Sequence, residues 1–330
     1  MSELTGLLLL TIILALLFDF SNGWHYCANA VATVVSTRVL SPLSAVIMAG
    51  VLNVAGAFFS TAVAKMIGGG IVHADTITNH VVAGAMGGAI IWNLFTLLLG
   101  LPTSSSHALI GGLVGSAVAH GGWDVVQFNG LRSILQAMVL SPVFGFGMGF
   151  LIMVAVSWIF FKVPRGIATR LFSRLQLCSA GFMAFSHGAN DAQKVMGVIT
   201  LALVASGQLT STEVPMWVIV ACALAMGAGT MVGGWRIVRT MGMRIAKLEP
   251  VHGFAAETGA ASVLLFAAHI GLPVSTTHTI TSSILGVGST RRLSAVRWGI
   301  TTKILSAWVF TLPGAGALGA VVYLLLAAFI

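Results

Sequence analysis

Half a chain separates two versions of one polar pattern: residues 20–29 read Phe-Ser-Asn-Gly-Trp-His-Tyr-Cys-Ala-Asn, and residues 185–194 read Phe-Ser-His-Gly-Ala-Asn-Asp-Ala-Gln-Lys. A second pattern is duplicated too. Residues 100–107 read Gly-Leu-Pro-Thr-Ser-Ser-Ser-His, and residues 271–278 read Gly-Leu-Pro-Val-Ser-Thr-Thr-His. All four are short polar clusters between long apolar runs. This arrangement predicts a doubled membrane unit with polar clusters at matching places.

The composition defines the class of protein. Hydrophobic residues make up 57% of the chain and charged residues 7%, with a mean hydropathy of +1.00, whereas soluble domains are about 25% charged. Many apolar runs approach the roughly 20 residues that a membrane helix needs, and the alternating pattern of a membrane barrel is absent. We therefore predict an all-α integral membrane protein, a bundle of about 10–12 membrane helices with some broken or re-entrant beside the polar clusters.

Basic residues are unevenly distributed. Lys and Arg number 16 against 8 Asp and Glu, and most lie in short clusters at residues 162–174, 236–247 and 291–297. The positive-inside rule places such loops in the cytoplasm. Because each cluster is short and bordered by apolar runs, we expect it to orient the chain in a membrane, and we expect no nucleic-acid partner.

Corresponding loops of the two halves differ in charge. With the second pattern superposed, residues 291–297 fall opposite residues 120–124, which contain no Lys or Arg. Inverted-topology repeats predict this difference, because they place equivalent loops on opposite sides of the membrane; a parallel duplication is the alternative. We predict a first inverted repeat at residues 1–161, a basic cytoplasmic linker at 162–174 and a second inverted repeat at 175–330, with both termini outside.

The first polar pattern contains residues that favour caps and turns. We expect residues 21–23 and 186–188 to interrupt membrane helices and to free backbone groups, for which ions are suitable partners. Asp191 stands out, because a carboxylate at the centre of a membrane helix costs roughly 2.5–3.5 kcal/mol on insertion scales. It marks an ion path, an ion pair with Lys194 three residues further along the same helical face, or both.

The second pattern places hydroxyl side chains after a proline and before a new apolar run, at residues 104–106 and 275–277. Such hydroxyls are good helix N-caps, and the start of a helix directs unpaired N–H groups and a positive dipole end at its surroundings. An anion is the natural occupant, and plain capping is the simpler alternative. Duplication in two inverted halves favours an anion site where the halves meet.

The four patterns, in this order over nearly the whole chain, resemble the signatures of the inorganic phosphate transporter (PiT) family. The resemblance implies inverted repeats that carry phosphate into the cell with sodium or protons. It implies that phosphate is bound by Ser104, Ser105, Ser106, Ser275, Thr276, Thr277, Asn29, Gln193 and Lys194. It further implies that the driving cations are held by Asn22, His25, Asn190 and Asp191, with a sodium site at Asn22, Asn190 and Asp191.

Two residues complicate this assignment. Glu257 lies in an apolar run before the second hydroxyl cluster, as a candidate cation-coupling carboxylate or as the partner of a basic group. Tyr26 stands where the family has an aspartate, and a phenol with a reference pKa near 10 carries no charge at neutral pH. Tyr26 is a natural variation that lowers the coupling stoichiometry, with His25 or Asp191 handling protons, or an introduced change that weakens transport, or the mark of another oxyanion.

We therefore expect a secondary active transporter, not an enzyme, that imports inorganic phosphate by sodium or proton symport through alternating access around a midplane anion site. The alternatives are a permease for sulfate or another tetrahedral oxyanion, an anion channel, and an intramembrane hydrolase. No cofactor beyond the coupling ion is expected. The expected location is the plasma membrane, or the inner membrane of a bacterium. Carriers commonly form symmetric dimers, so a homodimer is an open expectation.

Overall fold

The computed structural model describes residues 2–73 and 76–329, and these form a helical bundle. Apart from one isolated antiparallel bridge between Val72 and Val126, the described residues contain no β-structure. The fold thus confirms the predicted all-α membrane class. The helices are α1 (Ser2–Ser36), α2 (Pro42–Ala57), α3 (Ala62–Gly70), α4 (Asn79–Leu99), α5 (Ser105–Gly121), α6 (Phe128–Ile159), α7 (Arg165–Ala205), α8 (Met216–Val232), α9 (Trp235–Arg239), α10 (Pro250–His269), α11 (Thr276–Ser289) and α12 (Trp298–Phe329), with short turns η2 (Trp123–Val125), η3 (Thr240–Arg244) and η4 (Leu293–Ala295).

Five of these helices, α1, α4, α6, α10 and α12, are long and apolar enough to cross a membrane. Two further pairs pass the same test together but are bent at a short break. The α2–α3 pair bends by 72°, and α8 bends by 62° against the segment formed by α9 and η3. Each pair is a broken span or a re-entrant segment, as the sequence predicted in general terms.

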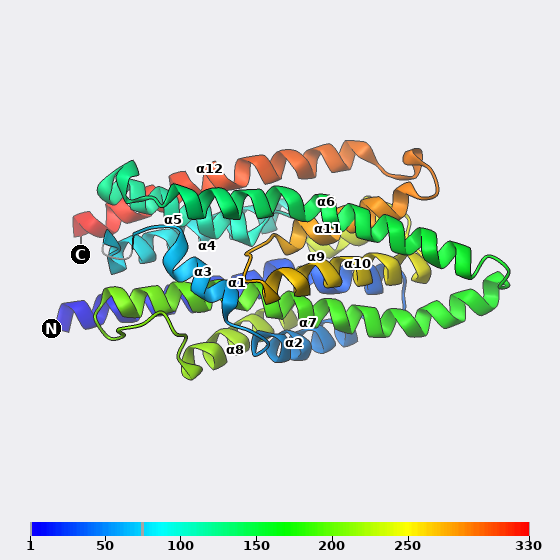
Figure 1. Cartoon of the computed structure of the whole chain (residues 1–330), viewed down its shortest axis with the longest axis horizontal. Coiled ribbons are helices and arrows are strands. Elements are labelled where there is room, and N and C mark those ends of the chain that lie inside the picture. The colour runs from blue at the N-terminus through cyan, green and yellow to red at the C-terminus, as the bar shows by residue number, and fades with distance from the viewer. Residues whose placement is uncertain (1, 74–75, 330) are drawn as a thin grey trace.

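The elements recur in the same order in the two halves of the chain: a long helix, a bent pair, a helix, a hydroxyl-capped helix and a long helix. Equivalent long helices run in opposite directions along the bundle, α1 against α7 and α6 against α12 (Figure 1). Both ends of the chain therefore lie at one end of the bundle, and the α6–α7 connection lies at the other. The division into inverted repeats remains a prediction.

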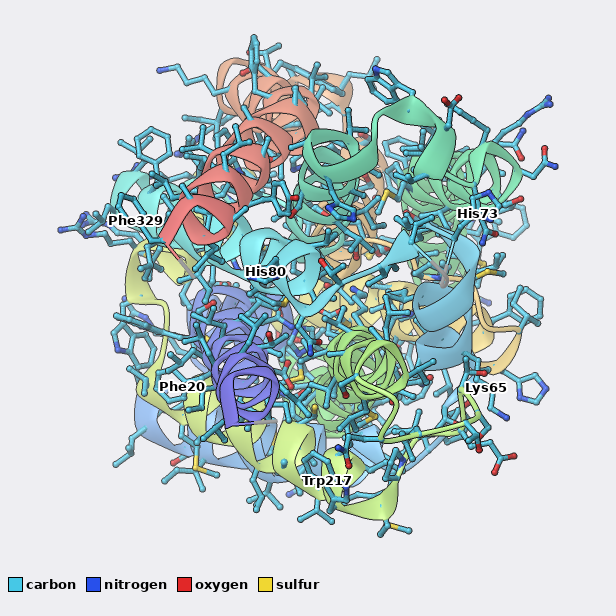
Figure 2. All side chains as sticks on the ribbon, turned by 90° about the vertical axis from the view of Figure 1, so that its left-hand side faces the viewer. Phe20, Lys65, His73, His80, Trp217 and Phe329 are labelled. Atoms are coloured by element: carbon cyan, nitrogen blue, oxygen red, sulfur yellow. The ribbon has the colours of Figure 1, made fainter. Side chains whose placement is uncertain are left out.

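The halves are interlocked rather than side by side. Helix α1 packs on α8 and α2 packs on α7, while α5 packs on α12 and α6 on α11. The sides of the bundle are apolar and exposed, as lipid contact requires: Val139 of α6 is 69% exposed and Val309 of α12 is 71% exposed. Viewed along the long axis, Lys65 and Trp217 lie at the rim of the bundle (Figure 2).

The location of the helix breaks corrects one prediction. Residues 21–23 and 186–188 were expected to interrupt helices, but α1 and α7 run through them without a break. The glycines serve close packing instead. A Cβ on Gly23 would lie 2.1 Å from the carbonyl oxygen of Met226, and one on Gly188 would lie 2.2 Å from that of Asn53. Ser21 bonds to its own helix by donating to the carbonyl of Phe18 at 2.8 Å.

The connection between the halves is shorter than the expected linker at 162–174. Helix α7 already begins at Arg165, so most of that basic segment is helical. Arg165 pairs with Glu249 at 2.8 Å on the exposed end of the bundle. The non-helical part is confined to residues 160–164, which leaves little slack between α6 and α7.

Candidate functional site

The two hydroxyl clusters begin α5 and α11 in the same way. Ser104 caps α5 by accepting a hydrogen bond from the amide of His107 at 3.3 Å, and Ser275 caps α11 by accepting one from His278 at 3.2 Å. The chain reaches both caps through a glycine with positive φ, 67° at Gly100 and 76° at Gly271. These contacts confirm the predicted helix starts, and each start directs backbone N–H groups and a positive dipole end forward.

The two capped helix starts meet. The hydroxyl of Ser106 in α5 donates to the carbonyl of Val274, just before α11, at 2.9 Å. The rings of His107 and His278 lie 4.7 Å apart, centroid to centroid, and Trp308 stacks on His278 at 3.7 Å. Two stretches 171 residues apart in sequence therefore form one polar region.

Asp191 lies at this junction and is contacted by polar side chains of three helices. Its carboxylate forms a short ion pair with Lys194 of the same helix. It also accepts hydrogen bonds from Thr276 at 3.1 Å and from Ser105 at 3.4 Å, and the Nε2 atom of His187 lies 3.4 Å away. Asp191 is 0% exposed and Lys194 is 1% exposed. The predicted ion pair with Lys194 is thus confirmed, and a place for Asp191 on an ion path stays a prediction.

Helix α1 supplies the fourth side of this cluster. The amide of Asn29 donates to Thr276 and to Thr277, in each case at 3.1 Å. Gln193, by contrast, accepts from the amide of Val63 at 2.9 Å and donates to the carbonyl of Ala189. Its side chain therefore forms its hydrogen bonds with α3 and with its own helix. Of the residues expected to bind phosphate, Gln193 is the one that the hydrogen bonds direct away from the junction.

The residues expected to hold cations fall into different settings. Asn22 and Asn190 are buried, and neither amide forms a hydrogen bond with any described residue. The ring of His25 lies between two backbone carbonyls, with Nδ1 3.1 Å from Asn93 and Nε2 3.3 Å from Leu101. Unpaired amide oxygens of this kind suit a hard monovalent cation, which favours oxygen ligands.

Glu257 lies in a separate cluster of its own. One carboxylate oxygen accepts from Thr33 and from Gln176, the latter at 3.1 Å, and the other accepts a short hydrogen bond from Ser179. These donors come from α1 and α7, so Glu257 links three helices. Its partners among the described residues are hydroxyl and amide donors, not the basic group of one alternative, and its role in cation coupling stays a prediction.

Tyr26 is buried and fully engaged. Its hydroxyl donates to the side-chain oxygen of Asn93 at 3.2 Å, and its ring stacks on His25 with 4.2 Å between centroids. A phenol here fills space and donates one hydrogen bond, where an aspartate would present two acceptor oxygens. The site therefore lacks one carboxylate on α1 at this position.

Asp19 is the functional candidate that the sequence analysis missed. It lies in α1 with 0% exposure. The signal was present, because the argument that singled out Asp191, a carboxylate inside an apolar run, applies equally to Asp19. It lies one residue before the duplicated pattern, which begins at Phe20.

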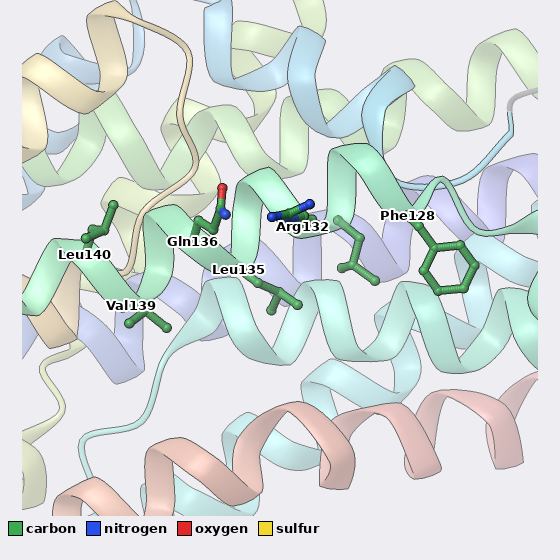
Figure 3. A pocket seen from close by; sticks show the side chains of 7 residues that line it. Phe128, Arg132, Leu135, Gln136, Val139 and Leu140 are labelled. Atoms are coloured by element: carbon green, nitrogen blue, oxygen red, sulfur yellow. The ribbon is translucent and has the colours of Figure 1, made fainter.

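Surface hollows are found outside this cluster of site residues. One of about 790 Å³ follows the exposed side of α6 from Phe128 to Leu140 and is lined by Arg132 and Gln136 among apolar side chains (Figure 3). It contains none of the predicted site residues. Within residues 2–73 and 76–329, no group of three or more His, Cys, Asp or Glu could hold a metal ion. Any cation would depend on hydroxyl, amide and single carboxylate oxygens.

Comparison with known proteins agrees with this arrangement. Probable low-affinity inorganic phosphate transporters of Rhizobium meliloti (strain 1021) and Bacillus subtilis (strain 168) are 48% and 45% identical to the chain. The first alignment covers 94% of each protein and the second covers 99% of each. A solved structure described as the sodium-dependent phosphate transporter has the same fold, with a TM-score of 0.90 at 24% identity over 98% of this chain and all of the other.

The model of the phosphate transporter family matches residues 22–319. The family and these relatives are transporters, which confirms that the chain is not an enzyme and removes the intramembrane hydrolase from the alternatives. The expected resemblance is confirmed as well. With a match of this extent, and with close relatives aligned from end to end, the chain belongs to the phosphate transporter family.

Proposed function

We propose that this protein imports inorganic phosphate by cation symport, with the anion held where α5 and α11 begin. One observation carries the proposal: two hydroxyl-capped helix starts converge beside the buried ammonium group of Lys194. Helix N-termini favour anions, and a buried cation among hydroxyl donors favours them further. The names of the relatives support phosphate as the anion.

The hydrogen-bond donors at the junction are already bonded to the carboxylate of Asp191. Asp191 is bonded to Lys194, Thr276 and Ser105, and these are among the groups that would bind phosphate. Two anions therefore compete for one set of donors. Phosphate can take these donors only if the negative charge in this region is balanced in another way, and a cation bound nearby supplies that balance. Through this competition, a bound cation raises the affinity for phosphate, and bound phosphate raises the affinity for the cation.

The coupling ion is sodium or a proton. Asn22 and Asn190 offer amide oxygens for sodium. His25 offers a proton site, because its two ring nitrogens face two carbonyl oxygens and only the protonated ring donates to both. The loss of a carboxylate at Tyr26 leaves anion binding in place and lowers the number of cations carried with each phosphate.

Alternating access would arise from movement of the two halves around this junction. The positive-inside rule places the α6–α7 connection in the cytoplasm and both termini outside, in the plasma membrane or the inner membrane of a bacterium. Cysteine substitutions at Arg38 and at Thr210, which follow the ends of α1 and α7, should react with a membrane-impermeant reagent from opposite sides. Reaction from the same side contradicts the inverted repeats.

Uptake of radiolabelled phosphate into proteoliposomes tests the function, with sodium and proton gradients imposed separately. A symporter accumulates phosphate against its gradient, whereas a channel does not. Competition by sulfate and arsenate distinguishes a phosphate carrier from a general oxyanion permease: arsenate should compete, and sulfate should not. Equal competition by sulfate contradicts phosphate selectivity.

The reading of Tyr26 has its own test. Tyr26→Asp restores a carboxylate on α1 and should increase the dependence of uptake on the cation gradient, because an added negative charge favours an additional cation. The measurement is the slope of uptake against cation concentration in matched proteoliposomes. Identical sodium and pH dependence in Tyr26→Asp and the native chain contradicts the altered-coupling reading.

A further inference from the structure

Asp19 differs from the other carboxylates buried in the bundle. Its side chain is 0% exposed, and Asn22 and Cys222 lie next to the carboxylate, but no hydrogen bond of normal geometry reaches either of its oxygens from the described residues. Among the residues whose burial is described, the two other acids with 0% exposure each have several hydrogen-bond donors. Asp191 has Lys194 and two hydroxyl donors, and Glu257 has three donors. A buried carboxylate without a cation or a well-formed hydrogen bond is costly, so Asp19 calls for a positively charged partner.

The neighbours of Asp19 point to a positive ligand. Asn22, three residues on along the same face of α1, lies beside the carboxylate, and neither of its amide atoms forms a hydrogen bond of normal geometry with the described residues. Cys222 of α8 lies beside the carboxylate, and Asp191 and Lys194 of α7 are the charged groups close enough to act on it. The charges of Asp191 and Lys194 offset each other. The region therefore carries one uncompensated negative charge, next to which an anion has to bind.

The position of Asp19 on α1 also relates it to Tyr26. The two residues are seven apart, which is close to two helical turns, so they share a face of α1 about 10 Å apart. Tyr26 provides no charge, and Asp19 is the carboxylate that this face of the helix retains. The face that carries Asp19, Asn22, Tyr26 and Asn29 ends at Thr276 and Thr277, where the amide of Asn29 donates.

We propose that Asp19 is the carboxylate at which the coupling cation binds, whether that cation is sodium or a proton, with the amide oxygen of Asn22 as a second ligand when it is sodium. This inference rests on the proposed symport and names the residue that performs the cation step. Neutralising Asp19 removes the repulsion that phosphate would otherwise meet, and bound phosphate in turn favours the cation at Asp19. Phosphate and cation therefore bind together.

Asp19→Asn tests the proposal, with Asp124→Asn, an exposed acid in η2, as the matched control. In proteoliposomes, Asp19→Asn should lower phosphate–phosphate exchange much less than it lowers accumulation driven by the cation gradient, because the permanently neutral side chain imitates the cation-loaded state. Accumulation driven by the cation gradient should fall by at least about tenfold. Asp124→Asn should change neither. Gradient-driven accumulation at the native level in Asp19→Asn overturns the proposal.

Thermal unfolding in detergent, without phosphate, gives a second and independent readout. Sodium at fixed pH, or acidic pH without sodium, should raise the Tm of the native chain and of Asp124→Asn, and the effective condition identifies the cation. Asp19→Asn should lose that response and should have a higher Tm than the native chain when no cation is bound, because an uncompensated buried charge has been removed. A retained response overturns the role of Asp19. Failure of the native chain to exchange phosphate would instead refute the proposed function, and the Tm comparison would still decide the cation site.

Discussion

The ion pair of Asp191 and Lys194 offers a way to separate structure from transport. Lys194→Gln leaves the Asp191 carboxylate buried at 0% exposure with its hydroxyl partners but no cation. Breaking a buried pair in this way costs about 3–5 kcal/mol, because the remaining charge is uncompensated. Asp191→Asn leaves the ammonium of Lys194 in the same condition. We expect both single variants to unfold at a clearly lower temperature than the native chain.

The double variant Asp191→Asn with Lys194→Gln removes both charges and should recover most of that loss. Phosphate transport should not recover, because the donor cation of the anion site is gone. The assay combines thermal unfolding in detergent with phosphate uptake in proteoliposomes. Arg165→Gln is the control, since it breaks an ion pair whose arginine side chain is 80% exposed and should change stability little. Native-like uptake by the double variant would refute the assignment of Lys194 to phosphate.

Two further predictions concern the junction and the helix packing. Thr276→Val removes the hydroxyl that joins Asn29 to Asp191. It should weaken phosphate binding by about tenfold or more, because a hydrogen bond to a charged group is worth about 1.5–3 kcal/mol. Equilibrium binding of labelled phosphate measures this change, and unchanged affinity excludes Thr276 from the site. Gly23→Ala should prevent close packing of α1 on α8, because its Cβ would lie 2.1 Å from a carbonyl oxygen. Gly166→Ala is the control, since its Cβ would have no neighbour within 4 Å. The yield of monodisperse protein is measured for both variants, and equal yields contradict the packing argument.

The sequence was a good guide to features that depend on local chemistry. Apolar runs predicted the membrane helices, and the proline followed by hydroxyls predicted the starts of α5 and α11, because capping is satisfied within four residues. The pairing of Asp191 with Lys194 followed from helical spacing for the same reason. The matching order of the patterns also indicated that the two capped helices belong to one site.

Features that depend on contacts between helices could not be predicted in this way. Gly23 and Gly188 suggested breaks, but a neighbouring backbone fills the place of each missing side chain and the helices continue. Gln193 lies between residues that face the junction, yet its amide bonds to the backbone of α3. The hydrogen-bond donors to Glu257 come from two other helices, and the sequence that flanks Glu257 does not predict them.

The contact between Ser106 and Val274 has a mechanical consequence. It joins the start of α5 to the segment before α11 at the place where Lys194 and Asn29 arrive from α7 and α1. In the proposed transport cycle, any movement that separates α5 from α11 would therefore also separate the hydrogen-bond donors that surround the phosphate. Opening of the site and release of the anion would then be a single step.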